Sequence, residues 1–248
     1  MLNIFFAVVG LLAGGLINLL ADDLPQREPP QPPRCIQCRY QYGPAGWLAW
    51  GRRLFLGGRC PQCGLPTRRR PLLVEIVTPV LFAALPAFLQ HPADLFFAAL
   101  YVAILILVIV TDVEHRLILH AVTFPGTLLA LVGSFFMTTN SVVLALLGAA
   151  VGFGVFFAFY WIGRFLFGPG ALGFGDVTLS TMLGAMLGFP YVIFALVIGV
   201  LLGGLISLLL IVTRQLKMSS YTAYGPYLAA AGILVIIWGE PLLEWYLS

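Results

Sequence analysis

The chain consists mainly of apolar tracts that are long enough to cross a membrane. Hydrophobic residues make up 60% of its 248 residues and charged residues only 9%, a balance that excludes an ordinary soluble domain. A membrane-spanning helix needs about 20 consecutive apolar residues. Tracts of this kind occupy residues 1–20, 72–89, 95–111, 121–139, 142–163, 191–213 and 222–239, and a shorter tract occupies 177–188. The sequence therefore predicts an all-α fold, a polytopic membrane helix bundle of about eight transmembrane helices.

The basic residues predict the orientation of these helices. If Met1 lies outside, the segments on the inner side are 21–71, the turn after Asp112, 164–176 and 214–221. These segments hold all 13 lysines and arginines of the chain, as the positive-inside rule expects of cytoplasmic loops. The net charge of +3 is then a consequence of topology, and it gives no reason to expect a nucleic-acid partner.

The long polar segment at residues 21–71 has the cysteine spacing of a metal-binding domain. Its four cysteines form two Cys-x-x-Cys pairs, Cys35 with Cys38 and Cys60 with Cys63. Four thiolates at this spacing are typical of a structural zinc site, because they complete a tetrahedron and leave no open position for catalysis. A cytoplasmic loop disfavours disulfides, and one this small has too little core to fold without metal. A thioredoxin-like redox pair and incidental thiols are the alternatives.

The sequence thus divides into a first transmembrane helix (1–20), a small cytoplasmic tetracysteine zinc-binding domain (21–71) and a membrane helix bundle (72–248). Within the second segment, residues 47–56 combine large apolar side chains with two arginines. This stretch is expected to form an apolar plug under the zinc-binding lobe, resting on the membrane interface near anionic lipid.

The acidic residues around this segment have simple structural interpretations. Asp22, Asp23 and Glu28 are expected to form a solvated charge cluster. Glu75 follows a proline and is expected in the first turn of the next helix, where the helix dipole favours an acid. A direct functional role for Glu75 is the less favoured alternative.

Two aspartates at the ends of apolar tracts are the candidate catalytic residues. Asp112 and Asp176 lie at such ends, and ionisable groups at membrane depth are rare and often functional. Gly173 and Gly175 precede Asp176 and allow its backbone to approach a partner closely. Because two membrane crossings separate the aspartates, both reach the same face, where two carboxylates can share one proton and activate one water. The alternative is that each aspartate only marks the end of a transmembrane helix.

These residues resemble those of the type IV prepilin leader peptidases, the GxGD membrane aspartic proteases of type IV pilus and type II secretion systems. The resemblance covers nearly the whole chain. Residues 14–25, 58–64 and 70–75 are similar to the family's first-helix exit, its second cysteine knuckle and the entry to its next helix. Asp112 matches the first catalytic aspartate of the family, and the segment 173–176 matches the GxGD motif that carries the second.

The resemblance implies an endopeptidase that removes a short basic leader from a prepilin or pseudopilin at the cytoplasmic face of the bacterial inner membrane. One aspartate would take a proton from water, while the other, protonated, would polarise the scissile carbonyl. Many members also methylate the new N-terminus with S-adenosylmethionine, but no motif here independently specifies a methyltransferase pocket. The family usually has a proline shortly after its first aspartate, whereas this chain has Ile118-Leu119-His120, so the turn there is expected to differ.

Two other classes of protein fit parts of the sequence. A transporter or channel with intramembrane carboxylates would place them near the bilayer midplane and would show repeated halves. A non-enzymatic zinc-bearing assembly factor would explain the cysteines and would leave the GxGD segment without a role. Leader removal from a prepilin distinguishes the peptidase from both.

Overall fold

The structure is a computed structural model that describes residues 1–168, 172–213 and 224–247. The basic residues Arg214 and Lys217, used above to predict the topology, lie outside the described residues. In chain order the described helices are α1 (Leu2–Asp23), η1 (Leu24–Gln26), η2 (Pro44–Gly46), α2 (Ala49–Phe55), α3 (Arg70–Phe88), α4 (Pro92–His115), α5 (His120–Gly133), α6 (Val142–Phe167), α7 (Phe174–Leu187), α8 (Tyr191–Val212) and α9 (Gly225–Leu247).

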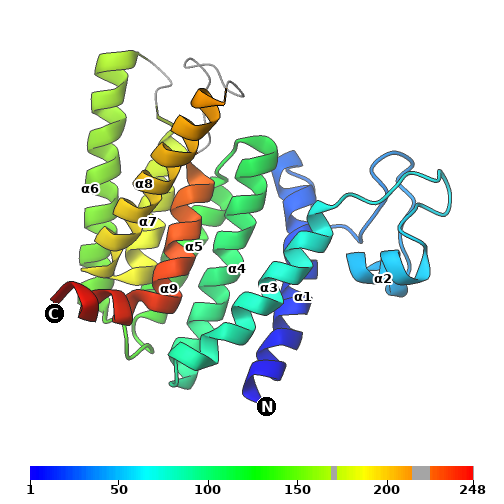
Figure 1. Ribbon diagram of the computed structural model, residues 1–248, viewed down its shortest axis with the longest axis horizontal. Coiled ribbons are helices and arrows are strands. Elements are labelled where there is room, and N and C mark those ends of the chain that lie inside the picture. The colour runs from blue at the N-terminus through cyan, green and yellow to red at the C-terminus, as the bar shows by residue number, and fades with distance from the viewer. Residues whose placement is uncertain (169–171, 214–223, 248) are drawn as a thin grey trace. The chain divides into compact units, whose positions relative to one another are not determined.

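The chain divides into two compact units, Met1–Ala87 and Phe88–Ser248. The first unit contains α1, the four cysteines, α2 and nearly all of α3. The second unit contains the helices from α4 to α9 and both candidate catalytic aspartates (Figure 1). The geometry of each unit is described by itself.

The predicted all-α membrane bundle is confirmed. Six helices of the described chain are long and apolar enough to cross a membrane, namely α1, α3, α4, α6, α8 and α9. Two shorter apolar helices, α5 and α7, complete the set. The protein is therefore a multi-pass membrane protein, and the short tract predicted at 177–188 is indeed a short helix.

Helix α5 is shorter than the tract at 121–139 suggested. A buried acid accepts hydrogen bonds from residues that follow the end of α5. Asp94 lies in the first turn of α4 and is only 2% exposed. Its carboxylate accepts hydrogen bonds from the backbone N–H of Thr138 at 2.8 Å, from the Thr138 hydroxyl and from the Thr139 hydroxyl. These bonds stabilise a turn after Gly133 in place of further helix.

Helix α7 is the central helix of the second unit, in contact with α5, α6, α8 and α9 (Figure 1). Its contact with α6 is made backbone to backbone: a Cβ atom at Gly148 would collide with the carbonyl oxygen of Gly184, and one at Gly152 with that of Ser180. The Ser180 hydroxyl also donates to the carbonyl of Gly152 at 3.0 Å. Small residues four apart are the usual means of such close approach between membrane helices.

The carboxyl end of α7 is held by a buried amide. Asn140 is 2% exposed, and its Nδ2 donates to the carbonyl oxygens of Ala185 at 3.0 Å and Met186 at 3.2 Å. The last carbonyls of a helix have no partner within the helix itself. Asn140 supplies one, so α7 is fixed along its length and at this end, and the position of its first turn is fixed with it.

We expect Gly152→Val to destabilise the second unit, because the new side chain would meet the backbone of α7. Overpacking of this kind costs about 1–3 kcal/mol. Gly154→Val on the same helix is the matched control, since a Cβ atom there has no neighbour within 4 Å. Thermal unfolding of the detergent-solubilised proteins measures the difference, and equal melting temperatures for the two variants would contradict this description of the α6–α7 contact.

Candidate functional site

Asp112 lies in the last turn of α4, directly before the chain reverses. Arg116 adopts a left-handed backbone conformation, with φ of 53°, and its N–H donates to the carbonyl of Asp112 at 2.9 Å. The Asp112 side chain is only 4% exposed, and among the described residues its Oδ2 atom has no hydrogen-bond partner. The backbone at the start of α9 lies against this carboxyl group, because a Cβ atom at Gly225 would collide with Oδ2.

Asp176 lies in the first turn of α7, where Gly173 is the N-cap. Its side chain is 8% exposed and close to the Gly173 backbone. The Asp112 carboxylate is near enough to interact electrostatically with it. The structure therefore brings the two sequence-predicted aspartates together within the second unit, from the carboxyl end of one helix and the amino end of another.

Ile118 packs between the two glycines that adjoin these aspartates. Cβ atoms at Gly175 and Gly225 would lie 2.9 Å and 3.0 Å from atoms of the Ile118 side chain. The turn that was expected to differ from that of the resembled family thus places an apolar side chain against the starts of both α7 and α9. Glycine at 175 and 225 leaves room for this side chain.

The sequence did not identify Gly225, His120 or Thr178 as parts of this region. Thr178 donates to the carbonyl of Gly175 at 2.9 Å, and its hydroxyl lies 3.4 Å from Nδ1 of His120. The one local signal for Gly225 is the following Pro226, since a proline near a helix start is common. The sequence contains no indication that this helix start would meet Asp112.

The four predicted metal ligands form a single cluster. The sulfur atoms of Cys35, Cys38, Cys60 and Cys63 all lie within 4.8 Å of one another, with Sγ–Sγ distances of 3.6 Å for Cys35–Cys63 and 3.5 Å for Cys38–Cys60. All four are free cysteines. Sulfurs placed about 2.3 Å from one tetrahedral metal ion would be roughly 3.8 Å apart, so the cluster could hold a metal ion.

Two equivalent backbone turns present these sulfurs. In the first, Cys35 N–H donates to Tyr40 at 2.8 Å and Arg39 N–H returns to the Cys35 carbonyl at 2.9 Å. In the second, Cys60 N–H donates to Leu65 at 2.9 Å and Gly64 N–H returns to the Cys60 carbonyl at 2.9 Å. The repeated pattern explains why each Cys-x-x-Cys pair points both of its sulfurs to one place.

The backbone of the second turn also favours a thiolate. Burial alone would raise the pKa of Cys60, but hydrogen bonds from the backbone of Cys63 and Gln62 oppose burial and lower this pKa to about 6. Metal ions bind the thiolate form of cysteine. The pKa of Cys38 moves the other way, to about 12: the backbone of Tyr40 lowers it, but burial and hydrogen bonds with the Cys60 and Cys35 thiols outweigh that effect.

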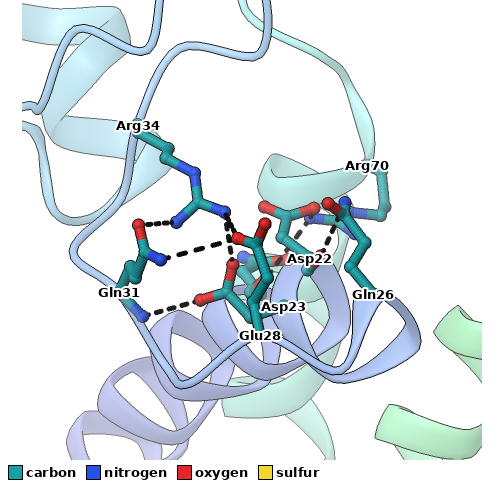
Figure 2. Close-up of polar contacts among 8 residues, drawn as sticks. Asp22, Asp23, Gln26, Glu28, Gln31, Arg34 and Arg70 are labelled. Atoms are coloured by element: carbon teal, nitrogen blue, oxygen red, sulfur yellow. Dashed lines mark hydrogen bonds and ion pairs between the residues drawn. The ribbon is translucent and has the colours of Figure 1, made fainter.

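The acids around the end of α1 are only partly the solvated cluster that the sequence predicted: Asp22 and Glu28 are accessible to solvent, Asp23 is buried, and all three form ion pairs (Figure 2). Asp23 is only 2% exposed, and its carboxylate pairs with Arg34 at 3.0 Å. Arg34 also pairs with Glu28 at 2.7 Å, and Arg70 pairs with Asp22 at 2.9 Å. The pairs of Arg34 join the start of the cysteine-bearing lobe to the carboxyl end of α1. The pair of Arg70 joins the amino end of α3 to the same end of α1.

Glu75 does not lie in the first turn of α3, where the sequence had placed it. It is 1% exposed, and its carboxylate accepts hydrogen bonds from the backbone N–H groups of Ala49 at 2.8 Å and Trp50 at 3.2 Å. The side-chain amide of Asn18 donates to the same carboxylate at 3.3 Å. Glu75 therefore holds the amino end of α2 against α3, and α1 takes part through Asn18.

The comparisons with known proteins place this membrane protein in a peptidase family. Residues 99–208, which include both aspartates, match the model of the type IV leader peptidase family. A relative from Aeromonas hydrophila is 32% identical over 205 residues, covering 81% of this chain and 68% of its own. Relatives from Pseudomonas aeruginosa and Xanthomonas campestris are 25% and 28% identical over 97% of this chain and 92% and 93% of theirs.

All three relatives are named prepilin leader peptidase/N-methyltransferase. No solved structure matches the chain. With this extent of similarity, the chain belongs to the type IV leader peptidase family.

We expect Glu75→Ala to release the amino end of α2, because the buried N–H of Ala49 and the partly buried N–H of Trp50 would lose their acceptor. Leaving a buried donor unsatisfied costs about 1–3 kcal/mol. Hydrogen exchange followed by mass spectrometry should show faster exchange of the amides of Ala49 and Trp50. Ile76→Ala is the matched control, since the neighbouring Ile76 is 44% exposed. Unchanged exchange in the Glu75 variant would refute the proposed contact.

Proposed function

We propose that the protein is a membrane-embedded aspartic endopeptidase that removes the basic leader from type IV prepilin-like proteins at the cytoplasmic face of the bacterial inner membrane. The observation that carries this proposal is that two buried carboxyl groups, Asp112 at the carboxyl end of α4 and Asp176 at the amino end of α7, are near enough to interact. Membership of the type IV leader peptidase family supports the same reaction.

The proposed chemistry is acid–base hydrolysis without a covalent intermediate. One carboxylate of the pair takes a proton from water, and the resulting hydroxide attacks the scissile carbonyl carbon. The other carboxyl group, protonated, donates a hydrogen bond to the carbonyl oxygen and then transfers its proton to the departing amine. The Oδ2 atom of Asp112 is buried and has no hydrogen-bond partner among the described residues, and this unused hydrogen-bonding capacity supports the proposed chemistry.

The proposed substrate is a prepilin or pseudopilin with a short basic leader followed by an apolar helix. Such a helix would lie in the bilayer and present its cytoplasmic end to the two aspartates. The one-sided distribution of arginines supports this orientation. In functional terms the chain divides into a first transmembrane helix (1–20), a zinc-binding segment (21–71) and the protease bundle (72–248).

We further propose that the cysteine cluster binds one structural Zn²⁺ through Cys35, Cys38, Cys60 and Cys63. Four sulfur ligands complete the coordination of zinc, so the ion would stabilise the lobe and take no part in peptide hydrolysis. N-methylation of the new N-terminus with S-adenosylmethionine is a second candidate activity. It is supported by the names of the relatives and by the retained tetracysteine lobe, and product mass after incubation with the methyl donor tests it separately.

We expect Asp112→Asn and Asp176→Asn each to lower prepilin cleavage by at least about 10²-fold, because an amide cannot exchange the proton that the reaction needs. Leader removal by the purified protein, followed by gel mobility and mass spectrometry, measures the effect. Glu240→Gln makes the same chemical change at an exposed carboxylate and should retain activity.

Near-normal turnover in either aspartate variant would show that the pair is not catalytic. If no prepilin is cleaved by the unaltered protein either, the transporter and assembly-factor alternatives become the better interpretations. The same variants then serve to test ion movement in proteoliposomes.

We expect protein purified without added metal to contain about one equivalent of zinc, because the four clustered thiolates form a complete structural site. Cys60→Ser should lose most of this zinc and should lower the melting temperature of the lobe. Acidification should also release the metal, since protons compete for the thiolates. Elemental analysis measures the content, and metal-free protein with a disulfide in each Cys-x-x-Cys pair would contradict the assignment.

A further inference from the structure

Helix α2 and Trp47, two residues before it, carry large apolar side chains that are exposed on the surface of the first unit. Trp47 is 57% exposed, Trp50 41%, Leu54 73% and Phe55 73%. Trp50 and Leu54 are four residues apart, so they lie on one face of the helix. The opposite side is occupied, since Ala49 is buried and Leu56, just past the helix, packs against the cysteine cluster. Exposed tryptophan and leucine side chains on one face, with a phenylalanine beside them, are typical of helices that lie in a membrane interface.

The contacts of α2 place its amino end beside the apolar helices α1 and α3. Leu48 directly precedes the helix and packs on Gly15, because a Cβ atom at Gly15 would lie 2.8 Å from its Cδ2 atom. Gly15 is eight residues before the end of α1, or about 12 Å along the helix axis at 1.5 Å per residue. Glu75, which holds the first N–H groups of α2, is five residues into α3, or about 7.5 Å by the same measure.

These two contacts fix the level of α2 relative to the spans of its own unit. Helices α1 and α3 are long and apolar enough to cross a membrane, and α2 begins alongside them, short of the ends that lead into the cysteine-bearing lobe (Figure 1). An interfacial helix buries its apolar face about 5–10 Å into the boundary between headgroups and acyl chains. Measured from the helix ends, the level of Glu75, about 7.5 Å, falls within this range, and that of Gly15, about 12 Å, lies slightly deeper.

The charge of the lobe is of one sign. Between Glu28 and Glu75 the sequence has eight arginines and no acidic residue. The acids at the end of α1 are already paired with Arg34 and Arg70. Five further arginines are exposed, and none of them forms an ion pair within the described parts of the chain: Arg39, Arg53, Arg59, Arg68 and Arg69.

We propose that α2 is an interfacial helix whose exposed face inserts into the bilayer crossed by α1 and α3, with the surrounding arginines bound to anionic phospholipid headgroups. The depth of α2 favours lipid over a soluble partner. The uniform positive charge disfavours a second copy of this lobe, since like charges brought together repel. Basic residues near an anionic membrane surface attract it strongly. This inference does not depend on the peptidase reaction or on the metal.

The test uses the full chain in lipid nanodiscs with a single tryptophan at position 50. Trp47, Trp161, Trp238 and Trp245 are replaced by phenylalanine, and quenching by phospholipids brominated at different depths is measured. We expect lipids brominated near the headgroup to quench Trp50 more than lipids brominated near the chain ends. At equal mole fraction, we expect brominated phosphatidylglycerol to quench about twofold or more better than brominated phosphatidylcholine.

A variant with Arg53→Gln, Arg59→Gln, Arg68→Gln and Arg69→Gln should lose the preference for the anionic lipid while keeping the shallow depth profile. Its melting temperature should match that of the parent, which shows that the lobe stays folded. A protein retaining only Trp161, exposed on α6, is the control and should show quenching without preference for the anionic lipid.

Three outcomes would overturn the proposal. Trp50 that no brominated lipid quenches would show that the face of α2 lies in water or against protein. Equal quenching by brominated phosphatidylglycerol and brominated phosphatidylcholine would show that the arginines do not bind anionic lipid. Trp50 emission that depends on the number of protein copies in each nanodisc, without lipid quenching, would assign the face to a second copy.

Discussion

The backbone contact between α6 and α7 is the interaction on which the second unit depends. Helix α7 has only 14 residues, and most of its side chains are buried by the surrounding helices. In a membrane, apolar side chains gain little by leaving lipid for protein, so close packing and hydrogen bonds must hold such a helix. The glycines of α6 permit that packing, and Ser180 and Asn140 add hydrogen bonds to it. The first turn of α7, with Asp176, is positioned as a result.

Much of the fold follows from the sequence, because a membrane span must satisfy its backbone within one helix and therefore appears as one apolar tract. The exception at α5 shows the limit of this argument. Residues 134–139 are compatible with helix by composition, yet Asp94 binds the backbone and hydroxyls of the threonines at 138 and 139. These partners are more than 40 residues from Asp94 along the chain, so no local pattern could have revealed the early end.

In the candidate site, too, the residues in local motifs could be predicted from the sequence, whereas contacts between distant segments could not. The two Cys-x-x-Cys pairs and the segment before Asp176 are local patterns, and the structure brings together the residues that they identify. The position of Gly225 against Asp112 depends on how α9 packs on α4, which the sequence of neither helix specifies. Glu75 was likewise interpreted from its neighbours in the chain, whereas its actual partners are the amides of Ala49 and Trp50.

The buried acids of the described chain separate into two groups by their partners. Asp23, Glu75 and Asp94 each accept hydrogen bonds or ion pairs from named donors. Asp112 and Asp176 have no such donors beyond nearby backbone, and Oδ2 of Asp112 has no hydrogen-bond partner among the described residues.

Burying a carboxyl group without partners costs several kcal/mol when it is charged, and placing a second one beside it adds repulsion when both are charged. The same fold supplies hydrogen-bond donors or a cation to the three other buried acids. The pair at Asp112 and Asp176 is instead left with capacity to bind a proton, a water molecule or a peptide carbonyl, which the proposed hydrolysis would require.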